Sequence, residues 1–100
     1  MSQEPLAPDV EIDGARVEQF VWLAGLVPSG KVTLLTEGRE IERPSGVAIC
    51  RYVGEDSVYL FYCTDTWKVL AAGHHSSLQA AEASAECAYP GLSERWVHRA

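Results

Sequence analysis

The fold is decided by residues 57–72, whose sequence is SVYLFYCTDTWKVLAA. Apolar side chains, most of them β-branched or aromatic, fill positions 58–63, polar residues follow at 64–66, and a second, mostly apolar run occupies 67–72. This pattern predicts a β-hairpin with strands at 57–63 and 67–72. Because successive side chains of a strand point to opposite faces, one face of the sheet is predicted to carry Tyr59, Phe61 and Cys63, and the other Val58, Leu60 and Tyr62.

The segments before this hairpin extend the predicted sheet. Residues 47–53 form an apolar run that ends at the turn signal of Gly54, and they predict a third strand. Residues 31–36 are rich in β-branched and apolar side chains and predict a fourth, with a charged loop or wide hairpin connection at 37–45. We therefore expect an antiparallel meander of three to four strands that ends at Gly73.

A helix follows the meander. Ser76 and Gln79 have the spacing of a capping box, which predicts that the helix begins there. Its apolar stripe is expected to contain Leu78, Ala81, Ala85 and Ala88, and its small side chains suit close packing against a sheet, whereas Glu82 and Glu86 are expected to face water. The sequence at 89–91, Tyr-Pro-Gly, predicts the end of this helix.

Residues 13–25 allow two interpretations. As a helix, Asp13 is the N-cap, and Val17, Phe20 and Val21 share a face that Ala24 completes. As strands, Asp13-Gly14 is a hairpin turn after residues 10–12. We favour the N-terminal helix, which predicts an α+β fold in the order α-β-β-β-(β)-α, with the meander packed against the C-terminal helix. The predicted boundaries are a tail at 1–9, a single domain at 10–97 and a tail at 98–100.

The charge of the chain narrows its expected partners. The 100 residues include 14 acidic and 8 basic side chains, which gives a formal net charge of −6. Nucleic-acid binding relies on clustered Lys and Arg, and here they are scattered, so neither nucleic acid nor a membrane is an expected partner. No apolar run approaches the about 20 residues of a transmembrane helix. The expected partner is another protein, for which the charge permits a basic surface, or a second copy in a homodimer.

The cysteines and histidines are the side chains with the most reactive chemistry. The three cysteines are odd in number and lack C-x-x-C spacing, as is typical of reduced thiols in a cytoplasm. A pocket containing Cys63, His74 and His75 is conceivable, but the hairpin keeps Cys63 too far from the histidines for a thiolate–imidazole pair. Buried thiols that pack as small hydrophobes are the favoured interpretation. We predict no catalytic residue, no cofactor and no metal site.

The aromatic residues of the hairpin are the other candidate site. Both faces of strand 57–63 are apolar, and one helix covers one face. The second face is either covered by the N-terminal helix, or exposed as a protein-binding surface anchored by Tyr59, Phe61 and Trp67. Core packing is the favoured interpretation.

The second half of the chain resembles a group of short bacterial proteins. The motif is YLFYC at 59–63, a turn, Trp67, the sequence His75-x-Ser77-Leu78 that opens an Ala/Glu-rich helix, Tyr89-Pro90-Gly91, and Trp96. The resemblance covers residues 47–96 and implies a stand-alone bacterial cytoplasmic protein with an α+β fold. Those proteins carry no assigned activity, so it implies no site. The predicted element order is also similar to that of double-stranded-RNA-binding domains, but the lysines that open their last helix are missing here.

These observations predict a non-enzymatic protein-interaction module, of a regulatory or immunity-like kind. The alternative is a small-molecule-binding protein or minor enzyme with a pocket between the sheet and a helix.

Overall fold

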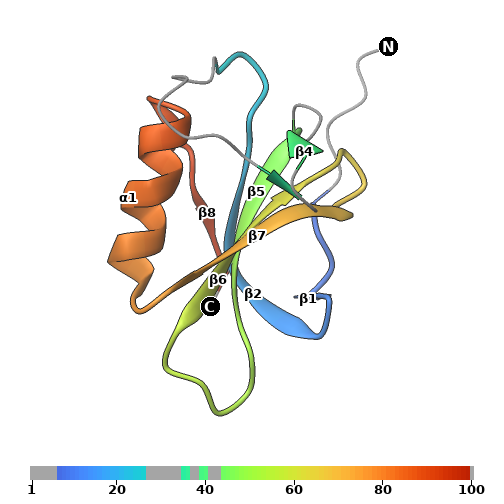
Figure 1. Cartoon of the computed structure of the whole chain (residues 1–100), viewed down its shortest axis with the longest axis vertical. Helices are drawn as coiled ribbons and strands as arrows, with labels where there is room; N and C mark the ends of the chain where they lie inside the picture. Colours follow the sequence, from blue (N-terminus) through green and yellow to red (C-terminus); the bar gives the residue numbers. More distant parts are fainter. Residues whose placement is uncertain (1–6, 27–34, 37–38, 41–43, 100) are drawn as a thin grey trace.

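The chain folds around a curled antiparallel sheet with one helix on its face (Figure 1). This computed structural model describes residues 7–26, 35–36, 39–40 and 44–99. The sheet has the strand order β1-β2-β5-β6-β7, and β8 also pairs with β2. The bounds are β1 (Glu11–Ile12), β2 (Ala15–Trp22), β5 (Gly46–Arg51), β6 (Val58–Cys63), β7 (Val69–His75) and β8 (Val97–His98). A separate hairpin contains β3 (Leu35–Thr36) and β4 (Arg39–Glu40), and the helices are α1 (Leu78–Ala88) and the short 3₁₀ helix η1 (Leu92–Glu94).

The predicted α+β class, antiparallel sheet and C-terminal helix are confirmed. Strands β5 and β6 fall on the predicted segments 47–53 and 57–63. The strand predicted at 67–72 begins two residues later and continues past Gly73 to His75, because Gly73 remains paired with Leu60. Of the strand predicted at 31–36, only residues 35–36 lie among the described residues.

The predicted N-terminal helix is wrong. Residues 11–22 form the β1–β2 hairpin instead, in which Ile12 pairs with Ala15 across a turn at Asp13 and Gly14. Both turn residues have left-handed backbones, with φ of 51° and 83°, which is the geometry that tight hairpin turns require and that Asp-Gly supplies readily. The hairpin interpretation of Asp13-Gly14 was therefore the correct one.

A β-bulge in β2 explains why this segment resembles a helix. Val17 pairs with Cys50, but the next paired residue is Gln19, opposite Ile49, so Glu18 is the extra residue. One inserted residue exchanges the two faces of a strand. Val17 before the bulge and Phe20 after it therefore lie on the same face, three residues apart, as they would in a helix.

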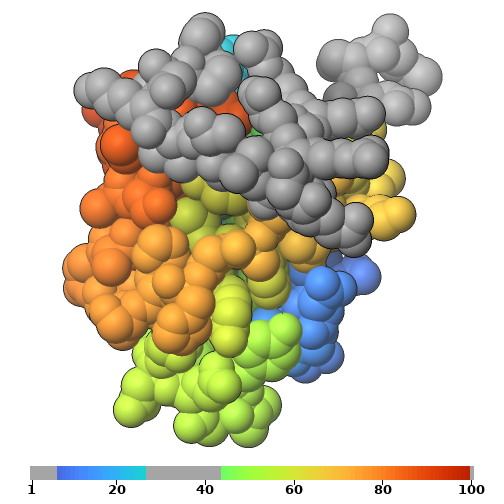
Figure 2. All heavy atoms as spheres, in the orientation of Figure 1, coloured from blue at the N-terminus to red at the C-terminus, as the bar shows by residue number. Residues whose placement is uncertain are grey.

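The helix α1 begins one residue later than the capping box predicts. Its N-cap is Ser77, whose side-chain oxygen accepts a hydrogen bond of 3.1 Å from the backbone N of Ala80. The predicted stripe is present, since Ala81, Ala85 and Ala88 are buried. These alanines let α1 lie close to the sheet face formed by residues that include Val47, Ile49, Val58 and Leu60. Figure 2 shows α1, in orange to red, along one side of the molecule.

The opposite face of the sheet is covered by the curl of the sheet itself. Its buried residues are Ile12, Ala15, Val17, Phe20, Ala48, Cys50, Phe61, Cys63 and Trp67. They come from β1, β2, β5, β6 and the β6–β7 turn, which bend around a shared interior. The second apolar face of β6 is thus buried without a second helix.

Candidate functional site

The predicted pocket residues are not brought together. In the β6–β7 ladder His74 pairs with Tyr59, whereas Cys63 pairs with Val69 at the other end. His75 pairs with Val58, on the face that α1 covers. Cys63 is fully buried and His74 is exposed, so these three side chains do not form one site.

Two of the three thiols are buried in the curled face. Cys50 and Cys63 have no exposed surface, and burial raises the pKa of each to about 12. The nucleophile and metal ligand is the thiolate, so these thiols remain protonated at physiological pH. The third thiol, Cys87, is exposed on α1.

The predicted aromatic anchors divide between core and rim. Phe61 and Trp67 are only 4% and 7% exposed, respectively, whereas Tyr59 is half-buried. The Tyr59 ring lies 5.3 Å from the ring of Tyr52 and 5.1 Å from that of His74, both edge-on. An aromatic row of Tyr52, Tyr59 and His74 therefore borders the curled face.

A cleft opens beside Trp67, at the border of the curled face. Its volume is about 380 Å³, and we call it the mouth cleft. It lies between the segment leading through β1 and the β6–β7 turn, and its lining residues are Ala7, Asp9, Glu11, Ile12, Asp13, Thr66 and Trp67. The three carboxylates stand on exposed residues, and the described residues of this lining include neither Lys nor Arg. The mouth cleft thus combines negative charge with an aromatic side chain.

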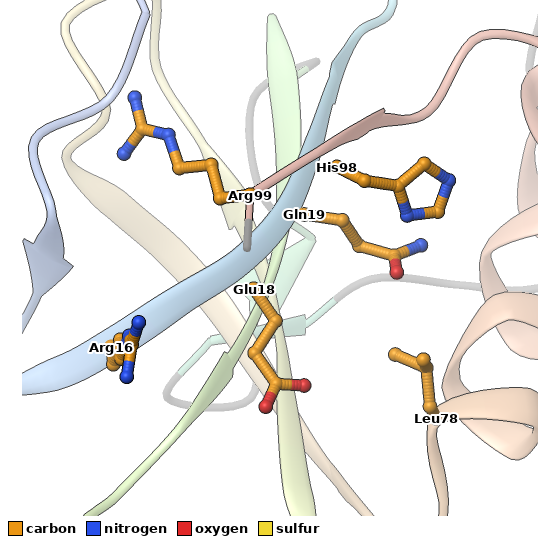
Figure 3. Close-up of a pocket in the computed structure, with 6 residues that line it drawn as sticks. All are labelled: Arg16, Glu18, Gln19, Leu78, His98 and Arg99. Carbon is orange, nitrogen blue, oxygen red and sulfur yellow. The ribbon is translucent and has the colours of Figure 1, made fainter.

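A second cleft separates β2 and β8 from the start of α1 (Figure 3). This β2–β8 cleft has a volume of about 370 Å³, and Arg16, Glu18, Gln19, Leu78, His98 and Arg99 line it. Gln19 is only 1% exposed, and its side-chain N donates a hydrogen bond of 3.1 Å to Glu82. In Figure 3 the side chains of Gln19 and His98 point toward α1, and that of Arg99 points away from it.

Glu18 is held beside the β2–β8 cleft by Arg51. The Arg51 Nε lies 2.8 Å from one Glu18 carboxylate oxygen, and Nη2 lies 3.4 Å from the other. The pKa of Arg51 is raised, mainly by this hydrogen bond. The bulge that places Glu18 outside the regular ladder thus also gives its side chain a fixed partner.

Arg99 holds residues 8–9, which border the mouth cleft, beside the edge of β2. Its guanidinium donates hydrogen bonds of 2.7 Å to the carbonyl of Asp9 and 2.6 Å to that of Pro8, and it lies 4.9 Å from the centre of the Phe20 ring. The Arg99 backbone N also donates to the Glu18 carbonyl, at 2.8 Å. A third cleft, of about 500 Å³, lies beside this contact and is lined by Pro8, Asp9, Val10, Arg16, Val17 and Arg99.

Sequence reasoning missed both named clefts. The signal for the mouth cleft was the alternation of Asp9, Val10, Glu11, Ile12 and Asp13, which is the acidic–apolar period of a half-buried strand. The β2–β8 cleft has no local signal, because its walls come from residues about 80 positions apart that meet only through the Gln19–His98 pairing.

The described residues form neither a metal-binding cluster nor a membrane-spanning helix. No three His, Cys, Asp or Glu side chains in residues 7–26, 35–36, 39–40 and 44–99 gather as metal ligands would. In the same part of the chain, no helix has the length and apolar character needed to cross a lipid bilayer. The chain matches no family model, no curated protein and no solved structure.

Proposed function

We propose that this protein is a non-enzymatic protein-interaction module that holds a basic segment of its partner in the mouth cleft. The observation that carries the proposal is the lining of that cleft, where Asp9, Glu11 and Asp13 stand opposite Trp67. The burial of Cys50 and Cys63, with pKa values of about 12, also argues against catalysis by these two thiols.

A Lys or Arg side chain has the chemistry that this cleft would recognise. Its aliphatic stem can pack on apolar groups such as Ile12 and Trp67 while its charged end stays near carboxylates in water. The net charge of −6 adds a long-range attraction for a basic partner, which accelerates association at low salt. On the resemblance of residues 47–96, we further propose a regulatory or immunity-like role in a bacterial cytoplasm.

The test compares two variants that lose the same charge. The cleft variant carries Asp9→Asn, Glu11→Gln and Asp13→Asn, and Asn tolerates the left-handed backbone at position 13. The matched variant carries Glu55→Gln, Asp56→Asn and Glu94→Gln, at exposed positions that do not line the mouth cleft. Each protein is immobilised and used to capture partners from a bacterial lysate, which are identified by mass spectrometry.

We expect a partner that the wild type and the matched variant capture and the cleft variant does not. Its affinity for the wild type, measured by calorimetry, should fall as salt is raised. Equal loss in both variants would assign the binding to net charge alone, and undiminished capture by the cleft variant would place the interface elsewhere. Either result contradicts the proposal.

A second candidate function is small-molecule binding in the β2–β8 cleft. The observation that favours it is Gln19, a fully buried amide beside a space that His98 and Glu18 also line. Amide and imidazole groups can fix a polar ligand by directional hydrogen bonds. In a metabolite screen by thermal shift, a ligand of this site should lose its effect in His98→Ala and keep it in Val97→Ala, since Val97 does not line the cleft.

A further inference from the structure

Arg99 connects β8 to the wall of the mouth cleft. It follows β8 directly in the sequence, and its guanidinium donates hydrogen bonds of 2.6 Å and 2.7 Å to the carbonyls of Pro8 and Asp9. Asp9 in turn lines the mouth cleft. Both bonds end on the backbone, so they fix the course of residues 8–9 and do not occupy the Asp9 carboxylate. The position of that carboxylate in the mouth cleft therefore depends on where Arg99 lies.

A second contact continues this connection along the same segment. The N of Val17 donates a hydrogen bond of 2.9 Å to the carbonyl of Val10. The third cleft, of about 500 Å³, is bordered by Asp9, Val10, Val17 and Arg99 together. Arg99 and Val17 thus hold adjacent parts of one segment beside β2, and release of the first contact is expected to weaken the second.

β8 itself is a short and exposed strand. It has two residues, Val97 and His98, and both are exposed. The backbone N of Arg99 adds one hydrogen bond, of 2.8 Å, to the carbonyl of Glu18. On the other side of β2, by contrast, β5 has six residues and is buried along almost its whole length. Because segments with few buried contacts open at free energies well below that of global unfolding, we expect residues 97–99 to separate from β2 while the rest of the sheet stays folded.

We propose that residues 97–99 form a latch that sets the affinity of the mouth cleft for its basic partner. In the latched state, which the structure shows, Arg99 holds Asp9 at the cleft. In the released state the latch leaves β2, and Pro8 and Asp9 lose their bonds to Arg99, so one of the carboxylates of the cleft is no longer fixed there. A basic segment contacts more of the latched state, so its binding favours closure of the latch, and closure raises its affinity by the same factor. The inference rests on the proposed function for the ligand, whereas the local opening of the latch does not.

Hydrogen exchange of the wild type, at low urea and without ligand, tests the latch itself. The amides of Arg99 and Val17 are the reporters, because they bond the carbonyls of Glu18 and Val10. We expect both amides to exchange through one shared opening, at a lower free energy than the slowest amides of β5 and β6. Exchange of both only through global unfolding, or with two different free energies of opening, would overturn the proposal.

Pentalysine serves as a probe of the mouth cleft, and the second test compares two arginine variants that keep the charge. Arg99→Lys loses the forked bonds to Pro8 and Asp9, and we expect it to bind pentalysine at least about threefold more weakly than the wild type at low salt. Arg95→Lys is the matched control, because Arg95 bonds the carbonyl of Ala24 instead, and it should bind like the wild type. Circular dichroism checks that both variants are folded under the conditions of binding.

The probe also reports the coupling in the reverse direction. In the wild type, saturating pentalysine should slow exchange at the Arg99 and Val17 amides, and in the cleft variant, which lacks the three carboxylates, it should not. Equal binding by the wild type and Arg99→Lys, or unchanged exchange with pentalysine bound, would overturn the latch and leave the proposed function standing. Failure of the wild type to bind pentalysine would contradict the proposed function and, with it, the role of the latch in binding.

Discussion

Trp67 is buried although its backbone has a φ of 66°, in the left-handed region that favours glycine. It closes the β6–β7 turn, where its N donates to the carbonyl of Thr64 at 3.0 Å and the N of Thr64 donates to the carbonyl of Lys68 at 2.9 Å. A left-handed backbone costs an ordinary residue about 1–2 kcal/mol. The compensation is that the indole lies over Gly46 and edge-on to the Phe20 ring at 5.7 Å.

Gly46 is predicted to be required by Trp67. A Cβ at position 46 would lie 2.6 Å from the nearest indole carbon, which is closer than atoms can pack. Gly46→Ala should lower the free energy of unfolding by about 1–3 kcal/mol, and by clearly less in a Trp67→Ala background, where the indole is gone. Urea denaturation followed by circular dichroism measures both. An equal loss in the two backgrounds would show that the two residues are not coupled.

Glu86 makes a pH-dependent connection between α1 and η1. Its carboxylate accepts hydrogen bonds from the backbone N of Gly91, at 2.8 Å, and from that of Ser93, at 3.0 Å. These bonds, the one from Ser93 first, lower the pKa of Glu86. Because the folded-state pKa is the lower one, the unfolded chain takes up the proton first as pH falls, and the stabilisation present at neutral pH is lost.

Glu86→Gln should therefore be less stable than the wild type at neutral pH, and the difference should shrink as the pH falls through the range of the carboxyl group. Thermal unfolding at several pH values measures this. Glu55→Gln, in the exposed β5–β6 turn, is the control. A difference that stays constant with pH would mean that the charge of Glu86 makes no contribution.

At the scale of elements, the bulge in β2 determines which side chains enter which core. Before Glu18, Val17 faces the curled interior, and after it, Phe20 does. Val21 then faces α1. The extra residue thus puts Val17 and Phe20 on the same face. In a regular strand, residues three apart would lie on opposite faces.

Deleting Glu18 should preserve cooperative unfolding, because Val17 and Phe20 would then lie two residues apart and share a face in a regular strand. Glu18→Ala keeps the bulge and removes the ion pair with Arg51. The side chains of Arg51 and Glu18 are 32% and 30% exposed, so this change should lower the free energy of unfolding by only about 0–1 kcal/mol. Urea titrations followed by tryptophan fluorescence compare the two variants. A deletion variant that unfolds without cooperativity would show that the fold requires the bulge.

The same bulge explains why one part of the fold was not predicted correctly from the sequence. The β6–β7 hairpin and α1 were predictable because alternation and an alanine stripe are local patterns. The β1–β2 hairpin was misassigned because the inserted Glu18 turns a period of two into the spacing of Val17, Phe20 and Val21 that a helix shows. The clefts were not predictable, because their walls combine segments far apart in the chain.

At the scale of the whole molecule, Arg99 connects the first and the last described segments. It binds the carbonyls of Pro8 and Asp9, and its backbone N pairs with Glu18. Residues 8–9 and 99, which the sequence boundaries assign to tails, therefore contact each other and the edge of β2. The bond from the N of Val17 to the carbonyl of Val10, at 2.9 Å, depends on the same segment.

Arg99→Lys should lower the free energy of unfolding by about 1–2 kcal/mol, because Lys keeps the charge but cannot donate in the same forked geometry. The Val17 amide should lose protection from hydrogen exchange, since residues 8–10 are released from β2. Arg95→Lys is the matched control, because Arg95 donates to the carbonyl of Ala24 at 2.6 Å, away from this segment. Unchanged protection of Val17 would show that Arg99 does not hold the segment in place.

The contact between Arg99 and residues 8–9 also brings the first and last described segments of the chain next to each other. A short linker across this contact and a new opening at Gly54, beside the fully solvent-exposed Val53, would give a circular permutant with the same strand pairing. In that molecule β8 precedes β1 directly, and the two strands that complete the edge of β2 become neighbours in sequence. In the natural chain, the pairing of β2 with β8 joins residues close to opposite ends of the sequence. In the permutant it would join residues close in sequence, and such a lower contact order accelerates folding.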